Sequence, residues 1–382
     1  MKQEDMSIWV PVGMSLLGRV IDADGNPCDD GPELFLDEYY PLEVAPPDAS
    51  TRLPINRRFQ TGVRAIDSML TMGKGQRMGI YSGSCTGKST LLGMIAQNNN
   101  ADVNVIGLIG ERPREAWDFI KRNLGEEALR RSVIVVASND QPAASRIRAA
   151  YVCTSVAEYF RDKGKDVLLI METVTRFAYA QREIGLAKGE PPAQKGFPPS
   201  VFEMIPNLIF RSGANDKGTI TAFYLELHDS EGDIANPIVD KMNACLDGHI
   251  VLSRKLAYAG HFPTIDILAS KNRISKMVTG RRTQKAVYLV SKLIKDYELA
   301  DSLIRAGRYQ KGTSPELDLA IEKHGEIEQF LQQEEESCSM AETLNMLSKL
   351  TGIDIPHVEY AEQINRHRLS KRKIYRKSWG II

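Results

Sequence analysis

Short, nearly uninterrupted apolar runs recur between residues 53 and 290, and they constrain the fold more than any other feature of the chain. Such runs are typical of strands buried on both faces, which occur in parallel sheets covered by helices. Helical patterns such as residues 145–163 separate them. The alternation therefore predicts an α/β fold with a largely parallel sheet. The runs are GQRMGIYSG (75–83), VNVIGLIG (103–110), SVIVVAS (132–138), DVLLIME (166–172), GTITAFYLEL (218–227) and GHIVLS (248–253).

The segments on either side of this core have other patterns. Residues 1–50 contain a short strand pattern, the turn sequence DGNP and a proline-rich stretch, which together predict a small β element and a linker. After about residue 284 the strands stop and apolar residues recur at helical spacing. We therefore divide the chain into residues 1–50, a core at 51–283, a helical domain at 284–350 and a tail at 351–382.

Composition excludes several classes of protein. Hydrophobic residues make up 42% and charged residues 26% of the chain, as in ordinary soluble proteins. The formal net charge is zero, which gives no electrostatic argument for binding nucleic acid or a membrane surface. The five cysteines are scattered and lack CxxC spacing, so we expect a reducing cytosol rather than disulfides or zinc. No apolar run approaches the roughly 18 residues of a membrane span.

The stretch YSGSCTGKST (81–90) lies between a predicted strand and a predicted helix. The backbone N–H groups of such a turn can cradle phosphates at the N-terminus of the helix. Gly87, Lys88 and Ser89 match the pattern GxxxxGK[ST], with Ser82 at the position of its first glycine. Lys88 is predicted to reach the β- and γ-phosphates and Ser89 to hold Mg²⁺; the alternative is an ordinary turn with a solvated lysine. The predicted nucleotide-binding residues of the loop are Ser82, Gly83, Ser84, Cys85, Thr86, Gly87, Lys88, Ser89 and Thr90.

Acidic residues close two of the strands that follow. Glu111 and Arg112 come directly after residues 103–110, and Glu172 ends residues 166–172. Open α/β sheets bind their ligands at the carboxyl ends of parallel strands. A carboxylate there can orient or deprotonate an attacking water, which is the role predicted for Glu111. Glu172 is predicted to act in the Mg²⁺ site. Each acid alone is more often a solvated strand-end residue, but their order after Lys88 favours a site.

Five long stretches between about Val10 and Arg273 have an unusual and specific sequence. They are PINRRFQTGVRAIDSML, GQRMGIYSGSCTGKSTLLGMIAQ, ADVNVIGLIGERPRE, SVAEYFRDKGKDVLLIMETVTRFAYAQREIGLAKGEPPAQKGFPPSVF and LDGHIVLSRKLAYAGHFPTIDILAS. With these stretches the chain resembles the ATPases of flagellar export and type III secretion systems, which are relatives of the catalytic subunit of rotary F-type ATPases. The resemblance implies a RecA-like P-loop NTPase core that assembles into a homohexamer with ATP and Mg²⁺ at the subunit interfaces. It also implies that residues 1–50 are a remnant of the family's N-terminal β-barrel.

The resemblance also implies individual roles. Glu111 is the catalytic carboxylate, Arg112 is its polar neighbour, and Lys88 completes the set at the phosphates. Phe262, in GHFPTID, contacts the adenine, and Arg273, in ASKNRIS, is an arginine finger that reaches the γ-phosphate of the neighbouring subunit. A guanidinium matches the spread charge of a transferring phosphoryl group and can be worth about 10³- to 10⁵-fold in rate.

Several positions depart from the family's pattern. Ser82 stands where alanine is frequent, Cys85 where glycine is usual, and Glu172 where aspartate is usual. If position 85 needs a positive φ, a cysteine there strains the loop by roughly 1–2 kcal/mol. The longer side chain of Glu172 moves its carboxylate toward the Mg²⁺ water shell, and Mg²⁺ tolerates misplacement poorly. Their clustering near the site predicts slow or impaired hydrolysis. The other departures are Pro113, Asn207, Phe210 and Asn243.

The two ends of the chain depart as well. The sequence opens near the end of the family's barrel, so we expect either a truncated form or a hexamer that depends on another element. The last residues contain seven Lys/Arg between Arg366 and Lys377. This basic run is predicted to tether the protein to an acidic partner, RNA or anionic lipid, or else to be a solvated tail.

The sequence therefore favours a Mg-ATP hydrolysing export ATPase that releases chaperones from exported proteins and unfolds them. We expect it in the cytoplasm, at the cytoplasmic face of the inner-membrane export apparatus, with export-apparatus proteins, secretion chaperones and exported substrates as partners. Peripheral membrane association is a further expectation, and a nucleic acid partner is not expected.

Two alternatives stay open. A pseudo-ATPase that serves as a structural or chaperone-docking subunit is favoured by Cys85 and Glu172. It is opposed by the retention of four residues, Lys88, Ser89, Glu111 and Arg273. An RNA-dependent hexameric motor is suggested by the ERP of GERPRE, which is similar to the transcription-terminating Rho helicase. Against it, no aromatic and basic OB-like domain precedes the core.

Overall fold

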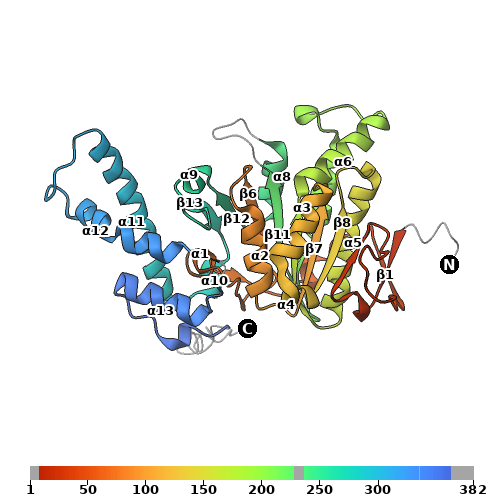
Figure 1. Cartoon of the computed structure of the whole chain (residues 1–382), viewed down its shortest axis with the longest axis horizontal. Helices are drawn as coiled ribbons and strands as arrows, with labels where there is room; N and C mark the ends of the chain where they lie inside the picture. Colours follow the sequence, from red (N-terminus) through yellow and green to blue (C-terminus); the bar gives the residue numbers. More distant parts are fainter. Residues whose placement is uncertain (1–7, 228–235, 335, 363–382) are drawn as a thin grey trace, which may run out of the picture.

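The computed structural model describes residues 8–227, 236–334 and 336–362. Within these ranges a nine-stranded sheet runs in the order β13-β12-β6-β11-β9-β7-β8-β2, with β10 paired to β11 beside this path. Neighbours from β12 to β2 are parallel, whereas β13 and β10 pair antiparallel. The predicted α/β fold with a largely parallel sheet is confirmed (Figure 1).

The elements have the following bounds. The strands are β1 (Trp9–Val12), β2 (Arg19–Ile21), β3 (Glu38–Pro41), β4 (Arg58–Phe59), β5 (Met72–Gly73), β6 (Arg77–Ser82), β7 (Val103–Ile109), β8 (Ser132–Ala137), β9 (Asp166–Glu172), β10 (Gly213–Ala214), β11 (Thr219–Leu227), β12 (Gly248–Leu252) and β13 (Ile265–Asn272). The α-helices are α1 (Arg64–Met69), α2 (Lys88–Asn98), α3 (Pro113–Asp118), α4 (Gly125–Arg130), α5 (Ala143–Asp162), α6 (Val174–Ala187), α7 (Pro199–Ile209), α8 (Pro237–Cys245), α9 (Arg254–Tyr258), α10 (Ser275–Val278), α11 (Arg281–Arg305), α12 (Pro315–Leu331) and α13 (Met340–Thr351). A π-helix (Phe119–Leu124) joins α3 to α4, and short 3₁₀ helices span Met14–Leu16, Ala49–Thr51, Gln194–Gly196 and His357–Glu359.

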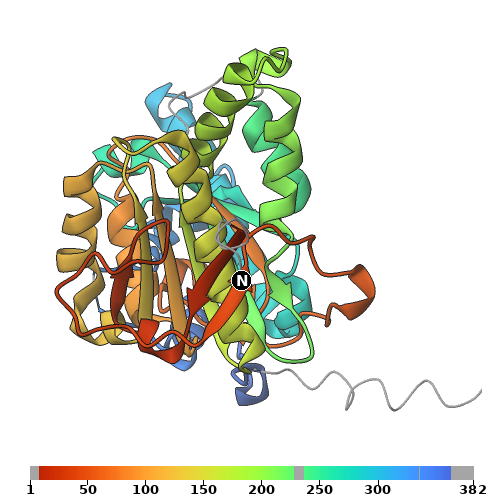
Figure 2. The same cartoon turned by 90° about the vertical axis from the view of Figure 1, so that its right-hand side faces the viewer.

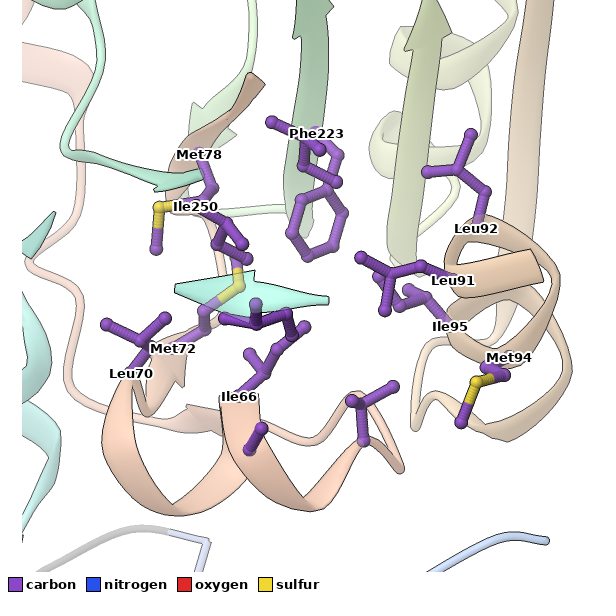
Figure 3. Packing of buried hydrophobic residues seen from close by; sticks show 14 of the residues in the cluster. Ile66, Leu70, Met72, Met78, Leu91, Leu92, Met94, Ile95, Phe223 and Ile250 are labelled. Carbon is purple, nitrogen blue, oxygen red and sulfur yellow. The ribbon is translucent and has the colours of Figure 1, made fainter. Parts of the chain in front are cut away.

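Helices cover both faces of the central sheet, which is why its middle strands are apolar along their length (Figures 1 and 2). Every residue of β7 is buried. One buried cluster contains α1 and α2, and the other contains α5–α8. In the first cluster, Leu91 and Ile95 of α2 and Ile66 of α1 gather beside Phe223 of β11 (Figure 3).

The parallel register brings several strand ends to one edge of the sheet. Leu227 at the end of β11 pairs with Ser82 at the end of β6, and Leu108 of β7 pairs with Glu172 at the end of β9. The loops that follow these strands therefore lie next to one another, although they are far apart in the sequence.

The described part of residues 1–50 joins the core. β1 and β3 form an antiparallel pair, while β2 adds a parallel strand beside β8. Val10, Leu16 and Leu42 lie in the same buried cluster as α5. The predicted β-barrel remnant is not confirmed, because the strands of residues 8–50 divide between a two-stranded sheet and the edge of the central one.

A buried ion pair holds this N-terminal segment in place. The guanidinium of Arg211, whose side chain is 1% exposed, donates to Glu158 Oε1 of α5 at 3.1 Å and to Ser155 Oγ at 2.9 Å. Arg211 also donates to the carbonyl of Leu42. One cation therefore connects the segment before the core to α5 and to the end of α7.

The predicted C-terminal helical domain is present as α11, α12 and α13. α12 begins with a capping serine, Ser314, and with Pro315 in its first turn. α13 begins with a capping box between Ser339 and Glu342. None of the helices in the described ranges is long and apolar enough to cross a lipid bilayer.

The beginning of the predicted tail folds back against α11. The buried carboxylate of Glu359 accepts the Thr283 backbone N–H at 2.9 Å and the Thr283 hydroxyl at 2.7 Å. A Cβ at Gly280 would lie 2.0 Å from Glu359 Cδ, so this close approach requires glycine. The basic run between Arg366 and Lys377 lies outside the described residues.

We expect Arg211→Met to lower the free energy of unfolding by about 3 kcal/mol. Without Arg211, Glu158 keeps only Arg161, whose nearest guanidinium nitrogen is 4.0 Å away. Arg305→Ala is the control, because its pair with Asp301 is solvent-exposed and should contribute no more than about 0.5 kcal/mol. Denaturant titration of both variants measures the difference; equal midpoints would contradict the anchoring role of Arg211.

Candidate functional site

The phosphate-loop sequence connects β6 directly to α2. β6 ends at Ser82 and α2 begins at Lys88, with Gly87 at φ 77° as the N-cap. The Thr86 hydroxyl donates to the carbonyl of Gly83 at 3.0 Å, and the Thr264 hydroxyl donates to the carbonyl of Thr86 at 2.6 Å. These bonds hold the turn open at the N-terminus of α2, where backbone N–H groups can bind an anion.

A cavity of about 530 Å³ opens at this turn. It is lined by the loop, by the ends of the neighbouring strands and by the helix that follows β7. Ser82 does not line it: its side chain is buried, and its hydroxyl has no hydrogen-bond partner. The lining residues are 83–90, Leu108, Glu111, Arg112, Glu115, Ala116, Phe119, Glu172, Arg176 and Leu227.

Cys85 occupies a strained position in the loop. Its φ is +62°, in the left-handed region that favours glycine, and its side chain is exposed toward the cavity. Position 85 therefore has the positive φ at which a cysteine is strained. The Cβ costs roughly 1–2 kcal/mol in this conformation.

The structure brings Lys88, Glu111 and Glu172 together at the cavity wall. Lys88 Nζ forms an ion pair with Glu172 Oε1 and lies 3.9 Å from Glu111 Oε1. Glu111 is 7% exposed, and its Oε1 has no hydrogen-bond partner. Burial raises the pKa of Glu111 and the charge of Glu172 raises it further, while Lys88 and Arg176 oppose the shift. A buried carboxylate with an unused acceptor beside a phosphate loop can accept a hydrogen bond from water.

Arg112 and Pro113 begin the helix that follows β7. Arg112 is the N-cap of α3, and its largely exposed guanidinium lies 3.4 Å from Glu115. Pro113 occupies the first turn of α3, where its missing N–H costs nothing. The departure at Pro113 is therefore compatible with the local backbone.

Arg176 was not singled out from the sequence, although it lines the cavity. Its Nη1 donates to the carbonyl of Gly110 at 2.9 Å, and its side chain packs against Gly110. Arg176 lies in the first turn of α6, four residues after Glu172. A cation in the first turn of a helix is unfavourable unless a nearby negative charge or acceptor offsets it. This unusual position of Arg176 was the sequence feature that could have indicated a role in the site.

A second cavity, of about 880 Å³, lies beside Phe262. Phe262 is 46% exposed, and a Cβ added at Gly87 would lie 3.3 Å from its ring. Gly87 and Thr90 line both cavities, so this space adjoins the phosphate loop. An aromatic ring beside such a space can stack on a nucleotide base.

The far wall of this second cavity belongs to the C-terminal helical domain. The Gln333 backbone N–H donates to the carbonyl of Phe262 at 2.9 Å, and its side-chain Nε2 donates to the carbonyl of Gly62 at 2.8 Å. His261 Nδ1 lies 2.7 Å from Glu328 Oε2, and His261 lowers the pKa of Glu328. None of these contacts between the core and the C-terminal helices was predicted from the sequence.

The structure does not bring Arg273 to the other predicted site residues. Arg273 is exposed just after β13, where its backbone N–H donates to the carbonyl of Asp247 at 3.0 Å, and it lines neither cavity. A role for Arg273 in this site would require a second subunit, and it stays a prediction.

Three of the departures do not lie in the site, which corrects the expected clustering. Asn243 accepts a hydrogen bond from Tyr81 at 2.8 Å, Asn207 is exposed on α7, and the Phe210 ring lies 5.2 Å from the Arg77 guanidinium. None of the three lines either cavity. Sequence separation from Lys88 does not tell where a residue lies in space. These three departures therefore do not support impaired hydrolysis.

The oxygen donors at the cavity fit a magnesium ion. Ser89 is exposed in the first turn of α2, and Glu111 and Glu172 provide carboxylates nearby. Mg²⁺ prefers such hard oxygen ligands and keeps several waters. In the described ranges no cluster of three or more His, Cys, Asp and Glu forms a metal cage, so a bound ion would need water and substrate oxygens as well.

We expect Cys85→Gly to raise the free energy of unfolding by about 1 kcal/mol, because the positive φ and the cost of the Cβ are present in the loop without nucleotide. Cys85→Ser is the matched control, because serine keeps the Cβ and should leave the free energy of unfolding close to that of the original chain. Denaturant titration of both variants measures the difference. Equal free energies of unfolding for the glycine and serine variants would remove the argument from strain.

Comparison with known proteins gives the family. The ATP synthase alpha/beta family, nucleotide-binding domain, matches residues 62–272, and the C-terminal domain of the type III secretion EscN ATPases matches residues 279–349. The flagellum-specific ATP synthase of Bacillus subtilis is 48% identical over 349 residues, which cover 91% of this chain and 79% of that protein. The type 3 secretion system ATPase of Sinorhizobium fredii is 45% identical over 344 residues, which cover 90% of this chain and 76% of that protein.

Solved structures agree with these relatives. A prototypical ATPase from the type III secretion system of pathogenic bacteria superposes with a TM-score of 0.85 at 45% identity, covering 90% of this chain and 99% of that one. The assembled ATPase EscN of enteropathogenic E. coli gives a TM-score of 0.86 at 45% identity, covering 90% of this chain and 84% of that one. The chain therefore belongs to the family of flagellum-specific and type III secretion ATPases, and it is an ATP hydrolase of that family.

Proposed function

We propose that this chain hydrolyses Mg-ATP in a flagellar or type III protein secretion system, and that hydrolysis drives the release of chaperones from exported proteins and the unfolding of those proteins. The observation that carries the proposal is the cluster of Lys88, Glu111 and Glu172 beside the N-terminus of α2. A phosphate loop alone indicates binding, whereas a buried carboxylate with an unused acceptor indicates hydrolysis.

The residues divide the work of the reaction. The loop amides and Lys88 bind the β- and γ-phosphates, and Phe262 stacks on the adenine. Glu111 holds the attacking water in line with the γ-phosphorus, where the new P–O bond forms as the bond to the β–γ bridging oxygen breaks. ADP leaves with that oxygen, and the proton released by the water passes to Glu111 or to the departing phosphate.

Ser89 and Glu172 are the proposed holders of Mg²⁺, which neutralises charge on the phosphates when it is bound. Glu172 is paired with Lys88. Lys88 must therefore exchange this carboxylate for phosphate oxygens when nucleotide enters, which frees Glu172 for the water shell of the ion.

Arg273 and the assembly form the second part of the proposal. EscN has been solved as an assembled ATPase and in a complex with its central stalk EscO. By analogy we propose a homohexamer in which Arg273 of one subunit reaches the γ-phosphate bound to the next. The exposure of Arg273, away from its own phosphate loop, supports a role between subunits.

We place the working assembly in the cytoplasm, at the cytoplasmic face of the inner-membrane export apparatus, with peripheral contact to the membrane. Its proposed partners are proteins of that apparatus, secretion chaperones and exported substrates, which the C-terminal helices contact. The formal net charge of zero supports protein partners over nucleic acid.

A pseudo-ATPase that docks chaperones is the second candidate. It is favoured by the positive φ of Cys85 and by Glu172, which stands where aspartate is usual in the family. An RNA-dependent motor is the weaker alternative, and RNA-stimulated hydrolysis would distinguish it.

The proposal is tested by steady-state ATP hydrolysis over a range of protein concentrations, with and without single-stranded RNA. We expect turnover per chain to rise with concentration, because an interface completes the site, and to be unaffected by RNA. Glu111→Gln should bind nucleotide normally but lose about 10²- to 10⁴-fold in turnover. Bound nucleotide with no turnover above this variant would establish the pseudo-ATPase.

The intersubunit role of Arg273 is tested by mixing two inactive variants. Arg273→Ala keeps an intact phosphate site but lacks the finger, and Glu111→Gln has the reverse defect. If the finger acts on the neighbouring subunit, mixed assemblies contain complete interfaces and recover part of the activity. Each variant alone stays inactive, with a loss of about 10³- to 10⁵-fold for the finger. Failure of the mixture, in assemblies shown to contain both chains, would reject the role.

A further inference from the structure

One face of α11 carries positive charge along most of its length. Helical residues repeat at about 100° each, so positions separated by alternating steps of four and three share a side. Tyr288 is 73% exposed and Leu299 is 54% exposed. We call this side the α11 basic face, and it consists of the exposed residues Arg281, Lys285, Tyr288, Lys292, Lys295 and Leu299.

The α11 basic face is the side of the helix without a packing partner. Ala286, Val290 and Leu293 lie on the opposite side of the helix and are buried in the cluster that includes α12 and α13. In Figure 1, α11 lies at the far end of the molecule from β1 and alongside α12, and it contacts the central sheet through the edge strand β13. A partner could therefore approach this face without displacing any described element.

The cations of this face have no acidic partner in the part of the chain that the structure describes. None of its four Lys and Arg forms an ion pair there. At 100° per residue, Glu298 and Asp301 fall outside the face, and Asp301 pairs instead with Arg305. Asp296 borders the face one turn after Lys292, but its Oδ2 is buried and has no hydrogen-bond partner in the described ranges. The helix contains six Lys/Arg and three Asp/Glu, although the whole chain has no net charge.

We propose that the α11 basic face docks an acidic helix of a protein partner. Its cations recur about once per turn over roughly 21 Å, which matches the repeat of acidic residues along one side of a second helix. Tyr288 lies between the two halves of the charged row, where an aromatic ring can anchor the apolar part of an amphipathic partner. The inference rests on the proposed docking role of the C-terminal helices and names the surface and the chemistry of the partner.

Other polyanions fit this face less well. Proteins that bind single-stranded nucleic acid use a basic groove with several stacking rings, whereas the α11 basic face is a convex helix with one tyrosine. A lipid surface selects helices with a broad apolar side, whereas the apolar side of α11 is buried in the protein. A matched helix satisfies both the spacing of the cations and the exposed Tyr288.

The test uses two synthetic helical peptides of equal composition and the full-length chain. In the first peptide, glutamates at positions 1, 5, 8, 12 and 15 form one row on an alanine- and leucine-based helix; in the second, the same residues are distributed around the helix. We expect the aligned peptide to bind at least tenfold more tightly, as measured by fluorescence anisotropy, and to weaken as salt rises. Lys285→Glu with Lys292→Glu should reduce binding at least tenfold.

The controls separate this inference from the proposed function. Lys311→Glu with Lys349→Glu makes the same change of net charge at exposed positions elsewhere in the helical domain, and it should bind the aligned peptide normally. Tyr288→Ala should weaken binding with no change of charge. ATP hydrolysis is measured on every variant and should be unchanged, since α11 basic-face residues line neither cavity.

Several outcomes would overturn the inference while hydrolysis persists. If both peptides bind equally, binding depends on net charge and not on the alignment of the glutamates. If both double variants lose the same affinity for the aligned peptide, the binding surface is not specific to α11. No peptide binding, together with binding of a heparin fragment or of phosphatidylserine vesicles that depends on Lys285 and Lys292, would make this face a polyanion or membrane site instead.

Discussion

Parallel pairing of β6, β11, β9 and β7 is the constraint on which the rest of the structure depends. Because their carboxyl ends meet at one edge, the phosphate loop, Glu111 and Glu172 arrive in one place from segments far apart in the chain. The burial of these strands between two layers of helices fixes that edge firmly. The chemistry of the site can therefore depend on side chains that are themselves expensive to bury.

The charges at this edge are balanced only partly. Lys88 satisfies Glu172 and approaches Glu111, but one oxygen of Glu111 is left without a hydrogen bond in a buried position. An unsatisfied buried acceptor costs stability, and such groups concentrate at functional sites. The left-handed Cys85 and the unsatisfied Glu111 both make this part of the fold less stable. Substrate phosphates and water would supply the missing interactions at the same place.

The helical domain helps to build the cavity beside Phe262. Gln333 bonds to both Gly62 and Phe262, and Glu328 pairs with His261, so the end of α12 shapes the cavity beside the aromatic ring. The wall of this cavity is therefore continuous with α12, which packs against α11. This contiguous set of bonds connects the core to the part of the molecule that is proposed to meet partners.

The sequence alone determined the parallel α/β core, the phosphate loop and the shared edge of Glu111 and Glu172, because hydrophobic period and strand-end position are local properties of the chain. The family resemblance drew attention to Cys85, but its positive φ came from the structure. Only the tertiary structure decided that Arg176 lines the cavity, that Asn243 does not, and that residues 8–50 extend the central sheet. Gln333 and Gly62 are 271 residues apart. Contacts of this kind form when helices and strands that are far apart in the sequence pack together, and no local sequence pattern encodes that packing.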